Sequence, residues 1–204
     1  MKIFSTAILL AVLASTLLLS QCNQKTADDQ SAPSTSAPTA FNGFGSQVKW
    51  GEHLVTIGGC NDCHSPKKMT DHGPEIDSSV LLSGHPAQMP PPDVNRQEME
   101  SKGLSVTSTL TAWVGPWGIS YSGNLTSDST GIGNWKEEQF IYALRYGKYK
   151  GLASTRPLLP PMPWQMYKHM TDDEMKAIFA YLKTTTPINN VVPPPAPPVS
   201  APRA

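Results

Sequence analysis

Residues 60–64 read Cys60-Asn61-Asp62-Cys63-His64, and two glycines come directly before them. Residues three apart lie on the same face of a helical turn, so the two thiols point to one side. The imidazole follows at once and can reach the same place. These five residues predict a site in which two sulfur atoms and one histidine act together.

Three kinds of site use two cysteines at this spacing. In the first, each thiol bonds to a haem and the adjacent His ligates its iron. A redox-active Cys-x-x-Cys needs a thioredoxin-like βαβ context, which the surrounding sequence does not indicate. A zinc site needs a second ligand pair, and no Cys follows Cys63. We therefore predict one covalent haem c, attached through Cys60 and Cys63, with His64 on the iron.

A proline-rich segment far along the chain is predicted to supply the second axial ligand. Prolines flank Met162 in Leu-Leu-Pro-Pro-Met-Pro-Trp, residues 158–164, and restrict its backbone. A thioether suits iron in an electron-transfer site, although Met more often fills core space. Met166 and Met170 are expected to pack under the last helix. The histidines that could take the place of Met162 are His53, His72, His85 and His169.

Three amphipathic helices are predicted from apolar residues that recur at three- and four-residue steps. Asn134 is expected to cap the second helix with Glu137 in a capping box, and Thr171 and Glu174 are expected to do so for the third. The three helices are expected at 48–58, 135–146 and 171–183, with a shorter one at 97–102. The predicted fold class is all-α, with three main helices around the haem and a long flanking loop, residues 65–134.

The ends of the chain differ in composition from its middle. A basic start and an apolar run, residues 3–19, predict an export signal rather than a membrane-spanning helix. The run ends in Leu-Leu-Ser-Gln-Cys, similar to a bacterial lipoprotein box, so Cys22 is predicted to carry the lipid; ordinary cleavage nearby is the alternative. Lipid and haem would use all three cysteines. The expected parts are a signal peptide (1–21), a lipidated flexible tether (22–45), a folded domain (46–190) and a Pro-rich disordered tail (191–204).

Charge and aromatic residues give further predictions. The 16 basic and 16 acidic residues cancel, and no nucleic-acid partner is expected. The stretch from Gln139 to Thr171 contains no acidic residue, whereas it contains five basic residues. They could pair with haem propionates or dock an acidic partner, although a solvated surface is commoner. Arg156 is the predicted propionate contact, and Trp117 and Trp164 are expected near the haem ring. The basic residues are Arg145, Lys148, Lys150, Arg156 and Lys168.

Residues 46–190 resemble class I monohaem cytochrome c domains and are particularly similar to cytochrome c subunits of membrane-bound bacterial dehydrogenases. The resemblance implies a His64 and Met162 axial pair and a crossing of the first and last helices near Gly51 and Tyr181. It also implies that residues 124–135 line the haem edge. The motifs that carry it are at 58–67, 124–128, 130–135, 159–164, 170–174 and 177–182.

Two departures from that family limit what is carried over. Its members often have two or three haem motifs, whereas this chain has one, and Ser127 stands where Pro is common. We predict an electron carrier rather than an enzyme, exported to the periplasmic side and held to a membrane by its N-terminal lipid. It would take one electron at a time from a redox protein donor and pass it to a redox protein acceptor, with no small-molecule substrate. The alternatives are a haem-based sensor or peroxidase-like protein with an open iron site, and an assembly subunit that binds a dehydrogenase.

Overall fold

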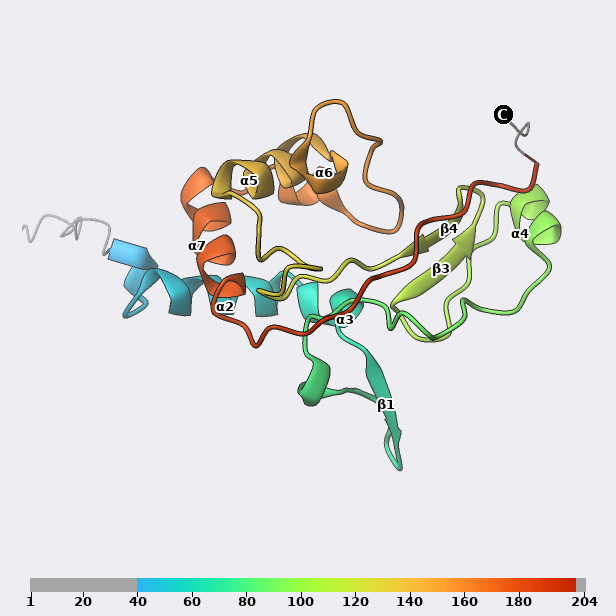
Figure 1. Ribbon diagram of the computed structural model, residues 1–204, viewed down its shortest axis with the longest axis horizontal. Coiled ribbons are helices and arrows are strands. Elements are labelled where there is room, and N and C mark those ends of the chain that lie inside the picture. Colours follow the sequence, from blue (N-terminus) through green and yellow to red (C-terminus); the bar gives the residue numbers. More distant parts are fainter. Residues whose placement is uncertain (1–39, 201–204) are drawn as a thin grey trace, which may run out of the picture. The chain divides into compact units, whose positions relative to one another are not determined.

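The computed structural model describes residues 40–200 of the chain (Figure 1). The predicted export signal and the lipid site at Cys22 lie outside the described residues. Within residues 40–200, none of the helices has both the length and the apolar character that a membrane crossing requires.

Three helices form the main core, as predicted: α2 (Gln47–Ile57), α5 (Glu137–Tyr146) and α7 (Asp172–Leu182). Helices α2 and α7 cross at Gly51, where a Cβ atom would lie 1.8 Å from the carbonyl oxygen of Ala177 and 2.9 Å from Cβ of Tyr181. The crossing near Gly51 and Tyr181 is therefore confirmed. Only a glycine allows the two backbones to approach this closely.

The predicted cap of the third helix is confirmed, and that of the second is wrong. Thr171 Oγ1 accepts from the backbone N–H of Glu174, and the Glu174 carboxylate accepts from that of Thr171. Helix α5 instead begins after Lys136, whose N–H donates to the Gln139 side chain at 3.0 Å. Asn134 lies in a preceding turn, and the extended backbone of Lys136 separates this turn from the helix.

The all-α prediction is wrong, because the segment expected to be a loop contains two small antiparallel sheets. Strand β1 (Lys67–Thr70) pairs with β2 (Gly73–Ile76), and β3 (Ala112–Gly115) pairs with β4 (Gly118–Tyr121). Each strand has four residues, which is too short for an alternating pattern to be recognised. The fold is mixed α and β.

Shorter helices complete the described part of the chain. The expected short helix is confirmed as α4 (Arg96–Lys102), and the cysteine motif forms α3 (Cys60–His64). Helix α6 (Trp164–Tyr167) follows the Met162 segment. Three 3-10 helices occupy Ala40–Gly43, Ser78–Val80 and Tyr149–Gly151.

The hydrophobic core draws on the loop as well as on the helices. Leu82 and Ile132 are fully buried and pack with the apolar faces of α2, α5 and α7. The helical members are Leu54, Val55, Phe140, Leu144, Met175, Ala177, Ile178, Phe179 and Leu182. The long loop is therefore part of the packed domain.

Residues 191–200 come after α7 in the chain and run alongside β4 toward α4 (Figure 1). Ala196 and Ile119 exchange two backbone hydrogen bonds of 2.8 and 3.1 Å. The structure therefore differs from the expected disordered tail, at least up to Ser200. A proline-rich segment already has an extended backbone. Pairing with β4 therefore needs only one free N–H in the segment, and Ala196 provides it.

Candidate cofactor site

One cavity of about 620 Å³ brings together the residues predicted to hold the haem. Cys60, Cys63 and His64 of α3 line it, and so does Met162, about a hundred positions further along the chain. A volume of this size lies within the range of about 300–1,000 Å³ that is usual for cofactor and ligand sites. The fold thus places the two motifs around one space.

The two cysteines are free, partly buried thiols at the start and the end of one helical turn. Gly59, with φ +67°, makes the turn that begins this helix. Burial raises the pKa of Cys60 to about 11, and burial followed by the charge of Asp62 raises that of Cys63. Both therefore remain protonated at neutral pH, unlike the low-pKa cysteine of a redox-active Cys-x-x-Cys.

The orientation of His64 is fixed by a backbone carbonyl. Its Nδ1 lies 2.8 Å from the oxygen of Gly123, which can only accept, so Nδ1 carries the proton. Nε2 is then left with its lone pair free for a metal. Burial lowers the pKa of His64, which favours the neutral ligand form. Nothing in the sequence points to Gly123 as this acceptor, because it lies 59 residues from His64.

The segment that carries Met162 is held at several points. Met162 is half-buried and packs against the core cluster, and its N–H donates to Leu159 at 3.2 Å. The N–H of Leu158 donates to the carbonyl of Gly147 at 2.7 Å. The hydroxyl of Ser120 on β4 donates to the carbonyl of Pro160 at 2.5 Å. These contacts, together with the prolines, hold the backbone of the Met162 segment at the cavity.

Trp117 and Trp164, expected beside the haem, do not line the cavity. Trp117 folds over Gly115 in the tight β3–β4 turn, and its indole N–H donates to Ser120, which in turn holds the Met162 segment. The ring of Trp164 lies over Gly147 at the end of α5. The aromatic residues that line the cavity instead are Trp113, Tyr121, Trp135, Phe140, Tyr149 and Tyr167.

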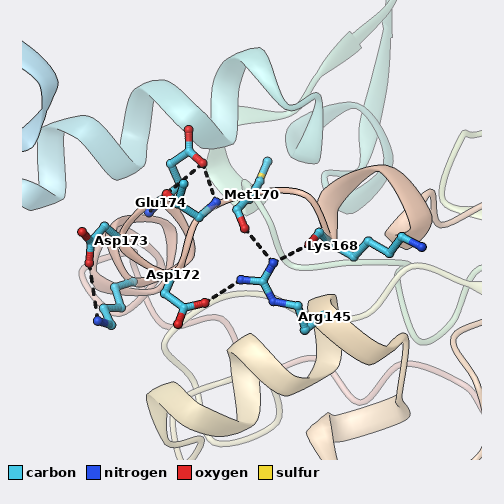
Figure 2. A network of polar contacts seen from close by, with 8 residues as sticks. Arg145, Lys168, Met170, Asp172, Asp173 and Glu174 are labelled. Atoms are coloured by element: carbon cyan, nitrogen blue, oxygen red, sulfur yellow. Dashed lines mark hydrogen bonds and ion pairs between the residues drawn. The ribbon is translucent and has the colours of Figure 1, made fainter.

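A second methionine, Met170, also lines the cavity and packs against the core, whereas Met166 is exposed. Figure 2 shows how the backbone around Met170 is held. The Arg145 guanidinium donates to the carbonyls of Lys168 and Met170 and to Asp172 Oδ1. The expectation of packing is therefore met by Met170 and not by Met166, and Met170 is a second methionine at the cavity.

None of the four alternative histidines lines the cavity. His53, His72 and His169 are exposed. His85 is fully buried, but both its ring nitrogens are engaged, by the Thr111 hydroxyl at 3.0 Å and by the Met89 carbonyl at 2.8 Å. A two-histidine site is thus not favoured by this arrangement.

Two of the five basic residues reach the cavity, Lys150 and the predicted Arg156. The Arg156 guanidinium stacks over the Tyr149 ring, 4.1 Å from its centroid, and donates to the carbonyl of Pro157. These contacts leave other N–H groups of Arg156 free to meet an anionic group. Lys150 was one of five residues in the basic stretch, and nothing in the sequence distinguished it.

Tyr167 connects the two motifs directly. Its hydroxyl donates to the carbonyl of Gly58 at 2.6 Å, and its ring lines the cavity. Burial, followed by the nearby Cys60, Cys63 and Asp62, raises the pKa of Tyr167 to about 12, so the hydroxyl remains a donor. The α6 end of the Met162 segment is therefore tied to the start of the cysteine motif.

The residues around the cavity fit a covalently bound haem. Two protonated thiols share one helical turn, an imidazole has one free nitrogen, and a thioether lies on a segment from elsewhere in the chain. Much of the remaining lining is aliphatic or aromatic, and Lys150 and Arg156 offer positive charge. Residues 124–135, which the resemblance placed at the haem edge, contribute several lining positions.

Comparison with known proteins finds relatives that are named as subunits of dehydrogenases. The chain is 43% identical over 70 residues to the fructose dehydrogenase cytochrome subunit of Gluconobacter japonicus. It is 31% identical over 135 residues to the gluconate 2-dehydrogenase cytochrome c subunit of Pantoea cypripedii, and 28% over 135 residues to the alcohol dehydrogenase (quinone) cytochrome c subunit of Gluconobacter oxydans. These three relatives are named as cytochrome or cytochrome c subunits of dehydrogenases.

The coverage of these matches is partial. They span 34%, 66% and 66% of this chain, but 14%, 22% and 20% of the relatives. The chain therefore corresponds to about a fifth or less of the length of each of these relatives. No family model matches the chain.

Proposed function

We propose that this protein is a monohaem c-type cytochrome that transfers single electrons. The observation that carries the proposal is the convergence of Cys60, Cys63, His64 and Met162 on one cavity. The similarity to cytochrome c subunits supports it independently. In this proposal the two cysteines bind the haem covalently, and His64 and Met162 are the axial ligands of its iron.

Each surrounding residue then has a defined task. The haem supplies the one-electron redox change. Gly123 orients His64, Tyr167 and Ser120 hold the Met162 segment, and Arg156 meets a propionate. Two protein ligands on the iron keep rearrangement small during electron transfer, and a Met ligand raises the potential.

Carbon monoxide tests this function against the alternative of an open iron site. A six-coordinate carrier, reduced with dithionite, should leave its absorption spectrum unchanged when carbon monoxide is added. Rapid formation of a carbon monoxide complex by the folded wild type would instead support a sensor or a peroxidase-like protein. A redox titration should fit one single-electron step, and two steps would contradict the monohaem proposal.

We further propose a dehydrogenase as the redox partner, because the relatives are named as subunits of such enzymes. Lys150 and Arg156 at the cavity form a basic docking surface that suits an acidic surface on the partner. Co-purification of the intact protein from membranes tests this. A dehydrogenase that reduces it, at a rate that falls as salt rises, is the expected finding, and reduction independent of salt would contradict the basic docking surface.

The lipid anchor at Cys22 and the division into signal peptide, tether and domain are part of the same proposal. Two acyl chains on an N-terminal cysteine would hold the protein stably at a membrane on the periplasmic side. Mass spectrometry of the mature N-terminus should find acylated Cys22. An unmodified start at or near that residue would refute the anchor without affecting the haem site.

A further inference from the structure

The C-terminal segment 191–200, here called the strap, forms part of the wall of the cavity that Cys60 and Met162 also line. We infer that the strap is a positioning element of the haem site, which shields the cofactor from water and from small ligands of the iron. This inference rests on the proposed function. The strap residues that line the cavity are Val191, Val192, Pro193 and Pro195.

The register of the middle of the strap is set by a single amide. Between Pro193 and Pro198, only Ala196 has a backbone N–H. That N–H donates to Ile119 at 3.1 Å, and the Ala196 carbonyl accepts from Ile119 at 2.8 Å. Because proline cannot donate, a shift by one residue would lose this donor. The pairing of Ala196 with Ile119 therefore determines which strap residues line the cavity, namely Val192, Pro193 and Pro195 among others.

The strap can approach the β3–β4 sheet closely because a glycine lies at the point of contact. Gly118, with φ +97°, precedes Ile119, and a Cβ atom there would lie 2.1 Å from the Ala196 carbonyl oxygen. A side chain at this position would be strained and would displace the strap. The glycine in the β3–β4 turn thus serves both the turn and the close approach.

Asn190 anchors the start of the strap. Its side-chain amide donates to the carbonyls of Ser83 at 2.7 Å and His85 at 2.9 Å, and its side-chain oxygen accepts from the N–H of Ala87 at 3.0 Å. Three hydrogen bonds from one side chain fix the direction in which the chain leaves the core.

Helix α4 anchors the other end. The carboxylate of Glu100 accepts from the N–H groups of Val199 and Ser200, at 2.8 and 3.0 Å, and from the Ser200 hydroxyl at 2.9 Å. Arg96 on the same helix donates to the carbonyl of Pro197. The strap is therefore fastened at its start, its middle and its end.

This construction suits a permanent cover. Proline-rich chain has few conformations to lose, so holding it in place costs little entropy. Burial of a haem away from water favours its reduced form and raises its potential, because solvent exposure is one of the factors that set the potential. Removal of the strap should therefore lower the potential and open the iron to added ligands.

The test compares cyanide binding to the ferric protein in the wild type and in a chain that stops after Asn190. We expect binding to be about tenfold faster in the shortened chain, equivalent to about 1.4 kcal/mol, and the midpoint potential to fall. A second variant, Ala196→Pro, removes the one backbone N–H between Pro193 and Pro198 and should change both quantities in the same direction but less. Pro194→Ala is the matched control, because Pro194 is exposed and does not line the cavity.

The possible outcomes distinguish a failure of the strap inference from a failure of the proposed function. A shortened chain with an unchanged circular dichroism spectrum and unchanged cyanide binding would overturn the inference. If the shortened chain does not fold, the Ala196→Pro variant decides. A rate of cyanide binding and a midpoint potential equal to those of the wild type would overturn the inference. Failure of the proposed function would be seen in the wild type itself, which would bind carbon monoxide when reduced.

Discussion

At the scale of single residues, the site joins atoms that are close in sequence with atoms that are not. Cys60, Cys63 and His64 are placed by one helical turn, and the motif alone predicts their grouping. Gly123 and Tyr167 complete the arrangement from distant parts of the chain, through hydrogen bonds of 2.8 and 2.6 Å. These partners hold His64, the proposed ligand, and the two motifs in fixed positions.

Substitution of the cysteines tests the covalent attachment. Cys60→Ser and Cys63→Ser should each keep one thioether bond, and the double variant should have no haem that survives denaturation. Mass spectrometry of the denatured protein measures this directly. Asn61→Ser, which leaves both thiols, is the control and should retain the full haem mass; covalent haem in the double variant would contradict the proposal.

The sequence could predict the site residues that belong to motifs and not those that depend on packing. Met162 stands between prolines, and the structure brings it to the cavity. Met170 lacks such a context, yet it lines the same cavity because Arg145 holds its backbone in place. Trp117 was expected at the haem but acts through Ser120, since a tight turn folds its ring onto Gly115.

At the scale of elements, helices with strong local signals were predictable and the strands were not. Thr171 and Glu174 form their capping box within four residues. The four-residue strands β3 and β4 are stabilised by neighbours, and so local pattern could not reveal them. The same holds for Asn134, which resembles a cap but lies in a turn.

The α2–α7 crossing gives a prediction for Gly51. Alanine is favoured over glycine inside a helix by about 1 kcal/mol, but here its Cβ would meet the Ala177 carbonyl. We expect Gly51→Ala to destabilise the fold by about 1–3 kcal/mol or more, the usual cost of overpacking, as measured by urea unfolding. Gly45→Ala, with no atom within 4 Å of the added Cβ, should have little effect. A stabilised Gly51→Ala would contradict the observed crossing.

The connection between α5 and α7 depends on Arg145 (Figure 2). Arg145→Ala removes charged hydrogen bonds to two backbone carbonyls and should cost about 2 kcal/mol in the free energy of unfolding. Asp172→Asn removes only the partner carboxylate, which is largely exposed, and should cost about 0.5 kcal/mol. Thermal or urea unfolding of both variants checks the ranking. Equal losses would show that the ion pair, rather than the carbonyl contacts, is the main interaction.

At the scale of the whole molecule, the described chain builds one cavity from segments spread over its length. Loop residues join the core, and the strap adds a wall to the cavity that the helices do not supply. The many prolines at the end of the chain led to the prediction of a disordered tail. Composition does not reveal that Ala196 pairs with Ile119 on β4. The place of the strap in the cavity wall depends on tertiary contacts, which cannot be derived from composition.

The absorption spectrum of the ferric protein tests the central claim, that His64 and Met162 ligate a haem held by Cys60 and Cys63. The wild type should show the weak long-wavelength band of sulfur bound to ferric haem. Met162→Ala should lose this band, and Met170→Ala should keep it. A wild type without the band, or a Met162→Ala protein that retains it, would contradict the account.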